Sequence, residues 1–269
     1  MRLHSLCGKL TQLRQLPLAA WPAFITGWMR RHKNGFVPCV LAGCRQTVDV
    51  PLREFYETYG YFCEHAGGRH ELNYFLGKLK GREVFYDIGA FRGAYSAAVR
   101  RKVPTASLHV FEPMPHNAKA VRRVFEMNHF QDFKVNEVAV NDGSTLSGSV
   151  NEQDVMLRIG ETVGGAAVKF ASVTLDEYVA GGHAAPTVVK IDVEGFELEV
   201  LQGARQCLLH HRPRLWLEVH PQFLKAQGKS ADAVLDLLRE TGYTVSPFAD
   251  FHLPGAGFSY HIWCEPAAA

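Results

Sequence analysis

The chain has 269 residues, of which 47% are hydrophobic and 21% are charged, and its net charge at pH 7 is +2. These values are typical of a globular protein with one large domain, or with one domain and an appendage. The small net charge excludes a strong attraction of the whole chain to polyanions.

The positive charge is concentrated at the start of the sequence. Residues 1–48 contain seven Lys or Arg and no acid, whereas residues 49–269 contain 22 basic and 27 acidic residues, a net charge of about −5. Such an asymmetry is typical of an arm that faces a membrane surface or a polyanion. The apolar stretch over residues 16–29 is interrupted by Pro17 and Pro22. It is too short to span a bilayer and does not have the form of a secretory signal.

We expect residues 1–80 to form a mainly helical extension, with one or two short helices near residues 16–29 that pack on the main domain. Peripheral contact with a membrane or a partner through residues 1–48 is the alternative. The six cysteines are scattered and lack C-x-x-C spacing, which favours free thiols in a reducing compartment. We therefore expect a cytoplasmic protein, with membrane association through the basic arm as an open alternative.

The main domain is expected over residues 81–269, where strand and helix patterns alternate as in an α/β sheet. The expected strands are 83–87, 108–112, 134–140, 187–192, 214–219, 243–246 and 258–264. The expected helices are 94–101, 115–128, 175–179, 196–209 and 231–241. The last two strands have no helix between them, so they should pair antiparallel. Residues 144–174 interrupt the alternation and predict a β-hairpin insertion.

A glycine turn, Asp87 to Gly93, follows the first strand and opens a helix. Small residues there let the backbone approach a ligand, and the helix N-terminus offers free N–H groups. Glu112 ends the next strand, 23 residues after Gly89, where an acid can accept hydrogen bonds from ribose hydroxyls. The G-x-x-x-G spacing lacks one glycine of a dinucleotide site, and Asp87 would repel a phosphate but suit an ammonium group. An adenosyl ligand that carries an amino acid and a sulfonium, such as S-adenosylmethionine, satisfies both observations.

Five segments in order resemble the FkbM family of S-adenosylmethionine-dependent methyltransferases. They are VFYDIGAFRGAYS (84–96), VFEP (110–113), VAVNDG (138–143), VTLDEY (173–178) and VKIDVEGFELEVLQGA (189–204), and LEVH (217–220) fits as a sixth. The resemblance covers roughly residues 80–245, and the 189–204 block is its most specific part. It implies a class I methyltransferase fold, which is Rossmann-like. Its seven-stranded sheet is mostly parallel, in the order 3-2-1-4-5-7-6, with an antiparallel last strand.

The turn and the resemblance together indicate which residues contact the cofactor. They are Asp87, Gly89, Ala90, Phe91, Gly93, Tyr95, Ser96, Glu112, Pro113, Ala139 and Asp192. The pair Phe91-Arg92 departs from the family, which often has a small polar residue followed by a hydrophobic one. We expect Phe91 to pack on the cofactor and Arg92 to face outward.

The acceptor side of the site is expected where the fourth and fifth strands end, since these strands are neighbours in the implied sheet. Asp192 and Glu194 leave one strand, and Glu218 and His220 leave the other. Period-two spacing places each pair on one face if the chain stays extended. His220 or Asp192 would serve as the base that deprotonates a hydroxyl acceptor. Alternatively, the four residues hold Mg²⁺ or Mn²⁺, or some are structural, with Glu194 capping a helix and Glu218 pairing with an Arg.

The acids that follow, Glu197 and Glu199, are expected to be solvated helix charges. The leading hypothesis is an O-methyltransferase that acts on a hydroxyl of a sugar, glycan or secondary metabolite, a substrate class that comes from the resemblance. A nucleic-acid substrate is disfavoured because the catalytic region is slightly acidic. A non-catalytic binding or scaffold protein on the same fold is the alternative of another class. The sequence gives no prediction of the oligomeric state.

Overall fold

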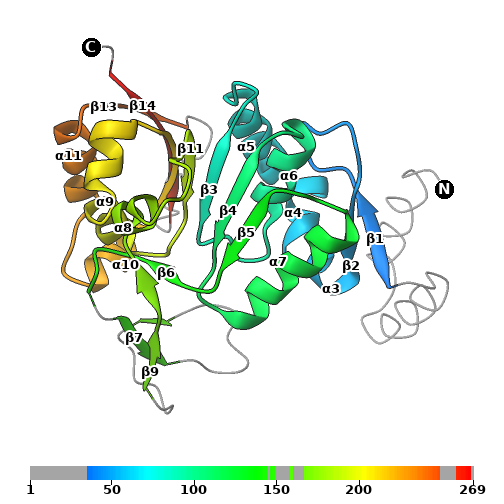
Figure 1. The fold of residues 1–269 in the computed structure, drawn as a ribbon, viewed down its shortest axis with the longest axis horizontal. Coiled ribbons are helices and arrows are strands. Elements are labelled where there is room, and N and C mark those ends of the chain that lie inside the picture. The colour runs from blue at the N-terminus through cyan, green and yellow to red at the C-terminus, as the bar shows by residue number, and fades with distance from the viewer. Residues whose placement is uncertain (1–34, 145, 150–157, 160–166, 249–258, 268–269) are drawn as a thin grey trace.

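The computed structural model describes residues 35–144, 146–149, 158–159, 167–248 and 259–267. Its centre is a seven-stranded sheet in the order β13-β14-β12-β11-β3-β4-β5 (Figure 1). The strands are β3 (Val84–Ile88), β4 (Ser107–Phe111), β5 (Phe133–Asn136), β11 (Val188–Ile191), β12 (Arg214–Val219), β13 (Tyr243–Pro247) and β14 (Tyr260–Pro266). Strand β14 is antiparallel to both neighbours, and the other pairings are parallel. The predicted class I methyltransferase fold, with its strand order and antiparallel last strand, is therefore confirmed.

Helices cover both faces of this sheet, because successive strand residues point to opposite sides. Phe85 belongs to one core cluster and Tyr86 to the other. The first face is covered by α5 (Ala66–Gly77), α6 (Ala94–Lys102) and α7 (Pro115–Met127), as Figure 1 shows. The second is covered by α8 (Leu175–Ala180), α9 (Glu197–Gln202) and α11 (Ala231–Glu240). Ser230 caps α11 as its position predicts, by accepting a hydrogen bond from the Ala233 N–H at 3.2 Å.

Three expected elements differ from those observed. The expected strand 134–140 is divided, because β5 ends at Asn136 and β6 (Ala139–Val140) pairs with β10 (Ser172–Val173) outside the main sheet. The expected helix 196–209 is α9 followed by a separate π-helical segment, η3 (Cys207–His211). The insertion contains three antiparallel strands, β7 (Leu146–Ser149), β8 (Arg158–Ile159) and β9 (Ala167–Phe170), with β7 in the middle. Figure 1 shows β7 and β9 beyond β6, away from the main sheet.

The segment before the sheet contains a β-hairpin as well as helices. Strands β1 (Phe36–Cys39) and β2 (Val48–Pro51) pair antiparallel. A continuous helical stretch follows, made of α3 (Leu52–Glu54), the π-helical segment η2 (Phe55–Tyr59) and α4 (Gly60–Glu64). The extended backbone of His65 separates it from α5. Side chains of the hairpin and of α5 share the core cluster of the first sheet face. The helices expected near residues 16–29 lie outside the described residues. Among the described helices, none is both long and apolar enough to cross a bilayer.

Candidate functional site

The glycine turn packs against the end of the neighbouring strand β11. Gly89 has φ +70°, and a Cβ at this position would lie 1.8 Å from the carbonyl oxygen of Asp192. Gly93, with φ +77°, stands directly before α6 as its N-cap residue. Gly89 is therefore required by the close approach of two strand ends, in addition to its left-handed backbone conformation. This contact fixes the turn relative to the acceptor side of the site.

Asp87 is fully buried and already has partners within the protein. Its Oδ2 accepts hydrogen bonds from the backbone N–H of Ser96 at 3.2 Å and from its Oγ at 2.5 Å. Its Oδ1 lies 3.7 Å from the Lys190 ammonium, which donates to the Gly89 carbonyl at 2.8 Å and to Asp192 Oδ2 at 3.1 Å. Burial raises the pKa of Asp87. Asp87 and Ser96 thus support the turn. Lys190, which was not predicted from the sequence, connects the turn to the acceptor side.

Glu112 joins the glycine turn to the start of α7. Its Oε2 accepts a hydrogen bond from the Phe91 N–H at 2.8 Å, and its Oε1 accepts from the Met114 N–H at 2.9 Å and from Asn117 Nδ2 at 3.4 Å. Because each carboxylate oxygen has two lone pairs, Oε2 retains capacity for a hydroxyl. The side chain is 95% buried, and burial raises its pKa to about 7.

The other residues expected at the cofactor occupy different positions around the turn. Ala90 donates its N–H to the Phe111 carbonyl at 3.2 Å, and Phe91 is half-buried with φ +51°. The Tyr95 hydroxyl donates to Glu71 of α5 and accepts from Trp216 Nε1 at 3.0 Å, which directs it into the core. Pro113 follows Glu112 and is half-buried, and Ala139 begins β6, which pairs with β10.

The expectation that Arg92 faces outward is wrong. Only 2% of this residue is exposed. Its guanidinium contacts two carboxylates, those of Glu54 and Glu57, which come from the helical stretch before the sheet. A buried arginine requires such partners, and they lie more than 30 residues earlier in the sequence.

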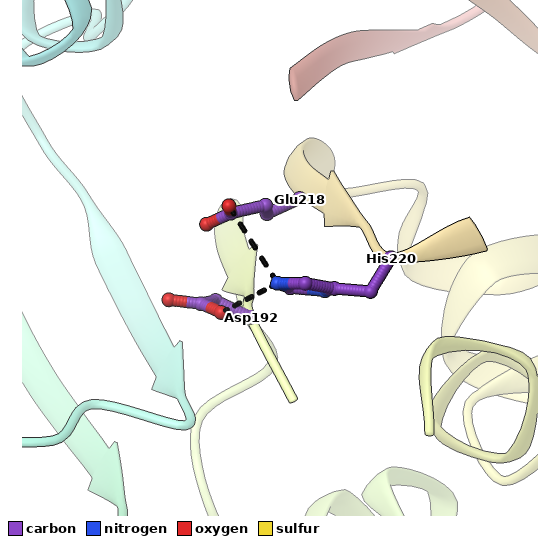
Figure 2. A group of neighbouring side chains, drawn as sticks. All are labelled: Asp192, Glu218 and His220. Carbon is purple, nitrogen blue, oxygen red and sulfur yellow. Dashed lines mark ion pairs between the residues drawn. The ribbon is translucent and has the colours of Figure 1, made fainter. Parts of the chain in front are cut away.

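The acceptor-side residues Asp192, Glu218 and His220 come together where β11 and β12 end, as expected from adjacent parallel strands. Figure 2 shows the imidazole directed between the two carboxylates. His220 Nε2 lies 3.6 Å from Glu218 Oε1 and 3.9 Å from Asp192 Oδ1. The carboxylate side chains are 20% and 32% exposed and the imidazole 9%, so the carboxylates form the open side of the cluster.

Glu194 is not part of this group of ligand atoms, although its carboxyl is close enough to Asp192, Glu218 and His220 to interact with their charges. Strand β11 ends at Ile191, and Glu194 has φ +49°, so the chain turns before Glu194 and period-two spacing no longer applies. Burial raises the pKa of its carboxyl.

Glu197 takes the place that Glu194 was expected to fill. Its side chain is fully buried, and its Oε1 lies 2.7 Å from Nδ1 of His220 and also accepts a hydrogen bond from the Gly195 N–H at 2.9 Å. The prediction that Glu197 and Glu199 are solvated is wrong, because Glu199 is also buried and pairs with Lys229. Burial opposes a charged His220, but the hydrogen bond that its Nδ1–H donates to Glu197 and the charges of Glu218 and Asp192 raise its pKa to about 9.

A second imidazole, that of His261 on β14, supports Glu218 from the opposite side. Its Nε2 lies 3.4 Å from Glu218 Oε2 and 3.5 Å from Glu71 Oε1, and its ring stacks on Trp216. Burial opposes the charged form of Glu218, but the hydrogen bond and charge of His261 outweigh it and lower the pKa to about 2. Glu218 therefore pairs with His261, and no arginine among the described residues forms an ion pair with it.

The Methyltransferase FkbM domain matches residues 87–245, more than half of the chain. The chain belongs to the FkbM methyltransferase family. The family is one of methyltransferases, and the match includes Asp87, Glu112, Asp192, Glu197 and His220. Glu54, Glu57, Glu71 and His261 lie outside it.

The individual proteins that this FkbM protein resembles share low sequence identity with it. It is 28% identical over 216 residues to the AMB antimetabolite synthetase AmbE of Pseudomonas aeruginosa; the alignment covers 64% of this chain but only 10% of that protein. The crystal structure of Methyltransferase FkbM from Methylobacillus flagellatus KT is 19% identical, with 70% of this chain and 45% of that chain covered and a TM-score of 0.48. SMU.1697c, a putative methyltransferase from Streptococcus mutans solved in complex with SAH, is 11% identical, with 73% and 95% covered and a TM-score of 0.46. The chain thus spans less than half the length of the first two proteins.

The pKa of Glu112 gives a testable pH dependence for cofactor binding by the FkbM protein. If Glu112 binds the ribose as predicted, a ribose hydroxyl would donate to the ionised carboxylate, whose fraction increases as the pH rises through about 7. We expect S-adenosylhomocysteine to bind more tightly at pH 8 than at pH 6 in calorimetric titrations. Glu112→Gln should weaken binding and remove most of this pH dependence. Equal affinity of the wild type at both pH values would contradict the assignment.

Proposed function

We propose that this chain methylates a hydroxyl group of a sugar, glycan or secondary metabolite, and that His220 is the base that accepts the hydroxyl proton. One observation carries the proposal: a buried carboxylate, Glu197, holds Nδ1 of His220 at 2.7 Å while Nε2 is directed toward the more exposed Asp192 and Glu218. A carboxylate that orients an imidazole and stabilises its charged form is the arrangement by which histidine acts as a general base.

S-adenosylmethionine, when bound, supplies an electrophilic methyl group: the C–O bond of a methyl ether forms as the C–S bond breaks. Glu112 and the backbone of the glycine turn would hold the adenosyl donor. Asp192 and Glu218 would accept hydrogen bonds from the acceptor and orient its reacting hydroxyl toward His220. Nε2 of His220 would take the proton of that hydroxyl, and Glu197 stabilises the resulting imidazolium.

His220 must be neutral before it can accept a proton, and its pKa of about 9 keeps it mostly protonated at pH 7 in the free enzyme. A sulfonium cation bound nearby disfavours a second positive charge, so cofactor binding should lower this pKa toward neutrality. The activity should therefore increase with pH above neutrality.

A divalent ion, the alternative for this cluster, does not fit the residues that surround it. Ligand atoms of Asp192, Glu218 and His220 lie within 4.8 Å of one another. However, the second oxygen of each carboxylate already faces a protein cation: Lys190 lies 3.1 Å from Asp192 and His261 lies 3.4 Å from Glu218. An ion would add two positive charges beside these groups. We therefore propose catalysis without Mg²⁺ or Mn²⁺.

Chelation tests this part of the proposal. After dialysis against EDTA, the enzyme should methylate its acceptor at the untreated rate, and added Mg²⁺ or Mn²⁺ should change the rate by less than about twofold. Loss of activity on chelation, with recovery on adding either ion, would show that the cluster does bind a metal.

A small-molecule or glycan acceptor agrees better with the charge distribution than a nucleic acid. Residues 49–269 carry a net charge of about −5, whereas a nucleic-acid site requires basic surface to neutralise phosphates. The open side of the cluster presents two carboxylates, which would repel a phosphate backbone but suit neutral hydroxyl groups. Membrane contact through residues 1–48 and a cytoplasmic location remain proposals from the sequence.

The experiment that tests the proposed function is a panel of acceptors with isotopically labelled S-adenosylmethionine. Monosaccharides, oligosaccharides, hydroxylated metabolites, amines and a mixed RNA are each incubated with the full chain, and products are identified by mass and by NMR. We expect a labelled methyl ether from a hydroxylated compound. Methyl transfer only to nitrogen or to RNA would overturn the proposal.

A further inference from the structure

Arg92 connects the glycine turn to a part of the chain that lies outside the family match. Its guanidinium Nη1 is 3.5 Å from Glu54 Oε1, and its Nη2 pairs with Glu57 Oε2. Arg92 and Glu54 are both buried, whereas the side chain of Glu57 is 32% exposed. A guanidinium removed from water in this way needs its carboxylates, since an unpaired buried charge is strongly unfavourable.

The same helical stretch also contacts the backbone of the turn. The hydroxyl of Tyr59, a fully buried residue of η2, donates a hydrogen bond to the Arg92 carbonyl at 3.0 Å. Arg92 is therefore held at its side chain by two carboxylates and at its backbone by a phenol.

This attachment lies one residue from the group that faces the cofactor. Phe91 has φ +51°, a conformation that side-chain-bearing residues rarely adopt, and its N–H donates to Glu112 Oε2 at 2.8 Å. The Arg92 guanidinium lies 5.2 Å from the centre of the Phe91 ring. The contacts of Arg92 with the helical stretch before the sheet thus keep Phe91 in its left-handed conformation. In that conformation the Phe91 N–H donates to Glu112, the carboxylate assigned to the ribose.

We propose that Glu54, Glu57 and Tyr59 are positioning residues for the cofactor: they hold the glycine turn, through Arg92, in the conformation that binds the adenosyl donor. The inference rests on the assignment of the cofactor to this turn. It explains why an arginine stands where the family often has a hydrophobic residue, because the residue here serves a segment that the family domain does not include.

The test is the affinity for S-adenosylhomocysteine, measured by calorimetry at a temperature well below the melting temperature of each variant. In Glu54→Gln/Glu57→Gln, Arg92 loses both anions, and we expect the Kd to rise at least about fivefold, the lower end of typical coupling between separate sites. Amide exchange of residues 88–93 should become faster in the same variant. Tyr59→Phe, which removes a single hydrogen bond, should raise the Kd by a smaller factor that still exceeds about twofold.

Asp236→Asn is the matched control, because it breaks an exposed carboxylate–arginine pair on α11, with Arg239 at 2.7 Å. Its Kd should equal that of the wild type. A Kd of the double variant within about twofold of the wild-type Kd overturns the inference. If the double variant does not fold, a Kd of Tyr59→Phe within about twofold of the wild-type Kd overturns it instead. A merely structural role would lower the melting temperature without changing the Kd. Wild-type protein that does not bind the ligand would instead contradict the cofactor assignment, so the two failures are distinct.

Discussion

Replacing His220 by glutamine is expected to lower kcat by about 10²–10⁴-fold, the usual contribution of a positioned general base. Glutamine cannot accept the hydroxyl proton, although it retains polar atoms near Glu197. The Kd for S-adenosylhomocysteine should stay within about twofold, because His220 contacts the carboxylates of Asp192 and Glu218, whereas the donor is proposed to bind at Glu112 and the glycine turn. Turnover is measured with the acceptor that the panel identifies.

His210→Gln provides the matched control, because His210 is exposed and its Nδ1 lies 3.0 Å from the carbonyl of Gln206, the residue before η3. It should retain wild-type turnover. Glu197→Gln should lower kcat without abolishing it, since the imidazole remains but loses the carboxylate that orients it. If His220→Gln keeps more than about half of the wild-type kcat, the base is another group.

Gly89→Ala is expected to destabilise the fold by about 2–5 kcal/mol, from overpacking and from a left-handed backbone conformation that alanine adopts poorly. The added Cβ would lie 1.8 Å from the Asp192 carbonyl oxygen and 2.8 Å from its carbon, and neither is the end of a flexible side chain. The turn must therefore separate from β11. We expect a lower midpoint in denaturant titrations and loss of S-adenosylhomocysteine binding.

Gly228→Ala separates the two causes of this loss. Gly228 has φ +74°, close to that of Gly89, but a Cβ there has no atom within 4 Å. Gly228→Ala should lower the free energy of unfolding by about 1–2 kcal/mol, the cost of a left-handed alanine alone, and leave ligand affinity unchanged. If Gly89→Ala is no less stable than Gly228→Ala and binds the ligand normally, the close contact with Asp192 does not hold the turn.

Part of the site could be predicted from the sequence because one simple rule applies to it. Parallel strands end at the same edge of a sheet. Asp192 follows one apolar run, and Glu218 and His220 stand at the end of another. The three side chains were therefore expected to meet, and they do. Period two holds for Glu218 and His220, since β12 remains extended through Val219. The same rule fails for Glu194, because the backbone leaves the strand at Ile191 and reverses at a positive φ.

The missed residues have partners that the local sequence does not reveal. Glu197 begins a helix, where an acid reads as a solvated charge, and only the return of β12 brings His220 to it. Arg92 reads as a surface residue after a turn because Glu54 and Glu57 are more than 30 positions earlier. Lys190 reads as a break in an apolar strand. In each case the burial is compensated by a charge that tertiary packing provides.

Whether His220 is the base is decided by the pH dependence of kcat/KM with S-adenosylmethionine as the varied substrate, because this ratio reports the ionisation of the base in the enzyme without cofactor. If His220 is the base, kcat/KM should rise about tenfold per pH unit and level off near pH 9, and in Glu197→Gln the plateau should begin at lower pH. The neutral imidazole is the active form, so activity is lost as the pH falls. A kcat/KM that does not change between pH 7 and 10, or one with the same break in Glu197→Gln, would show that His220 is not the base.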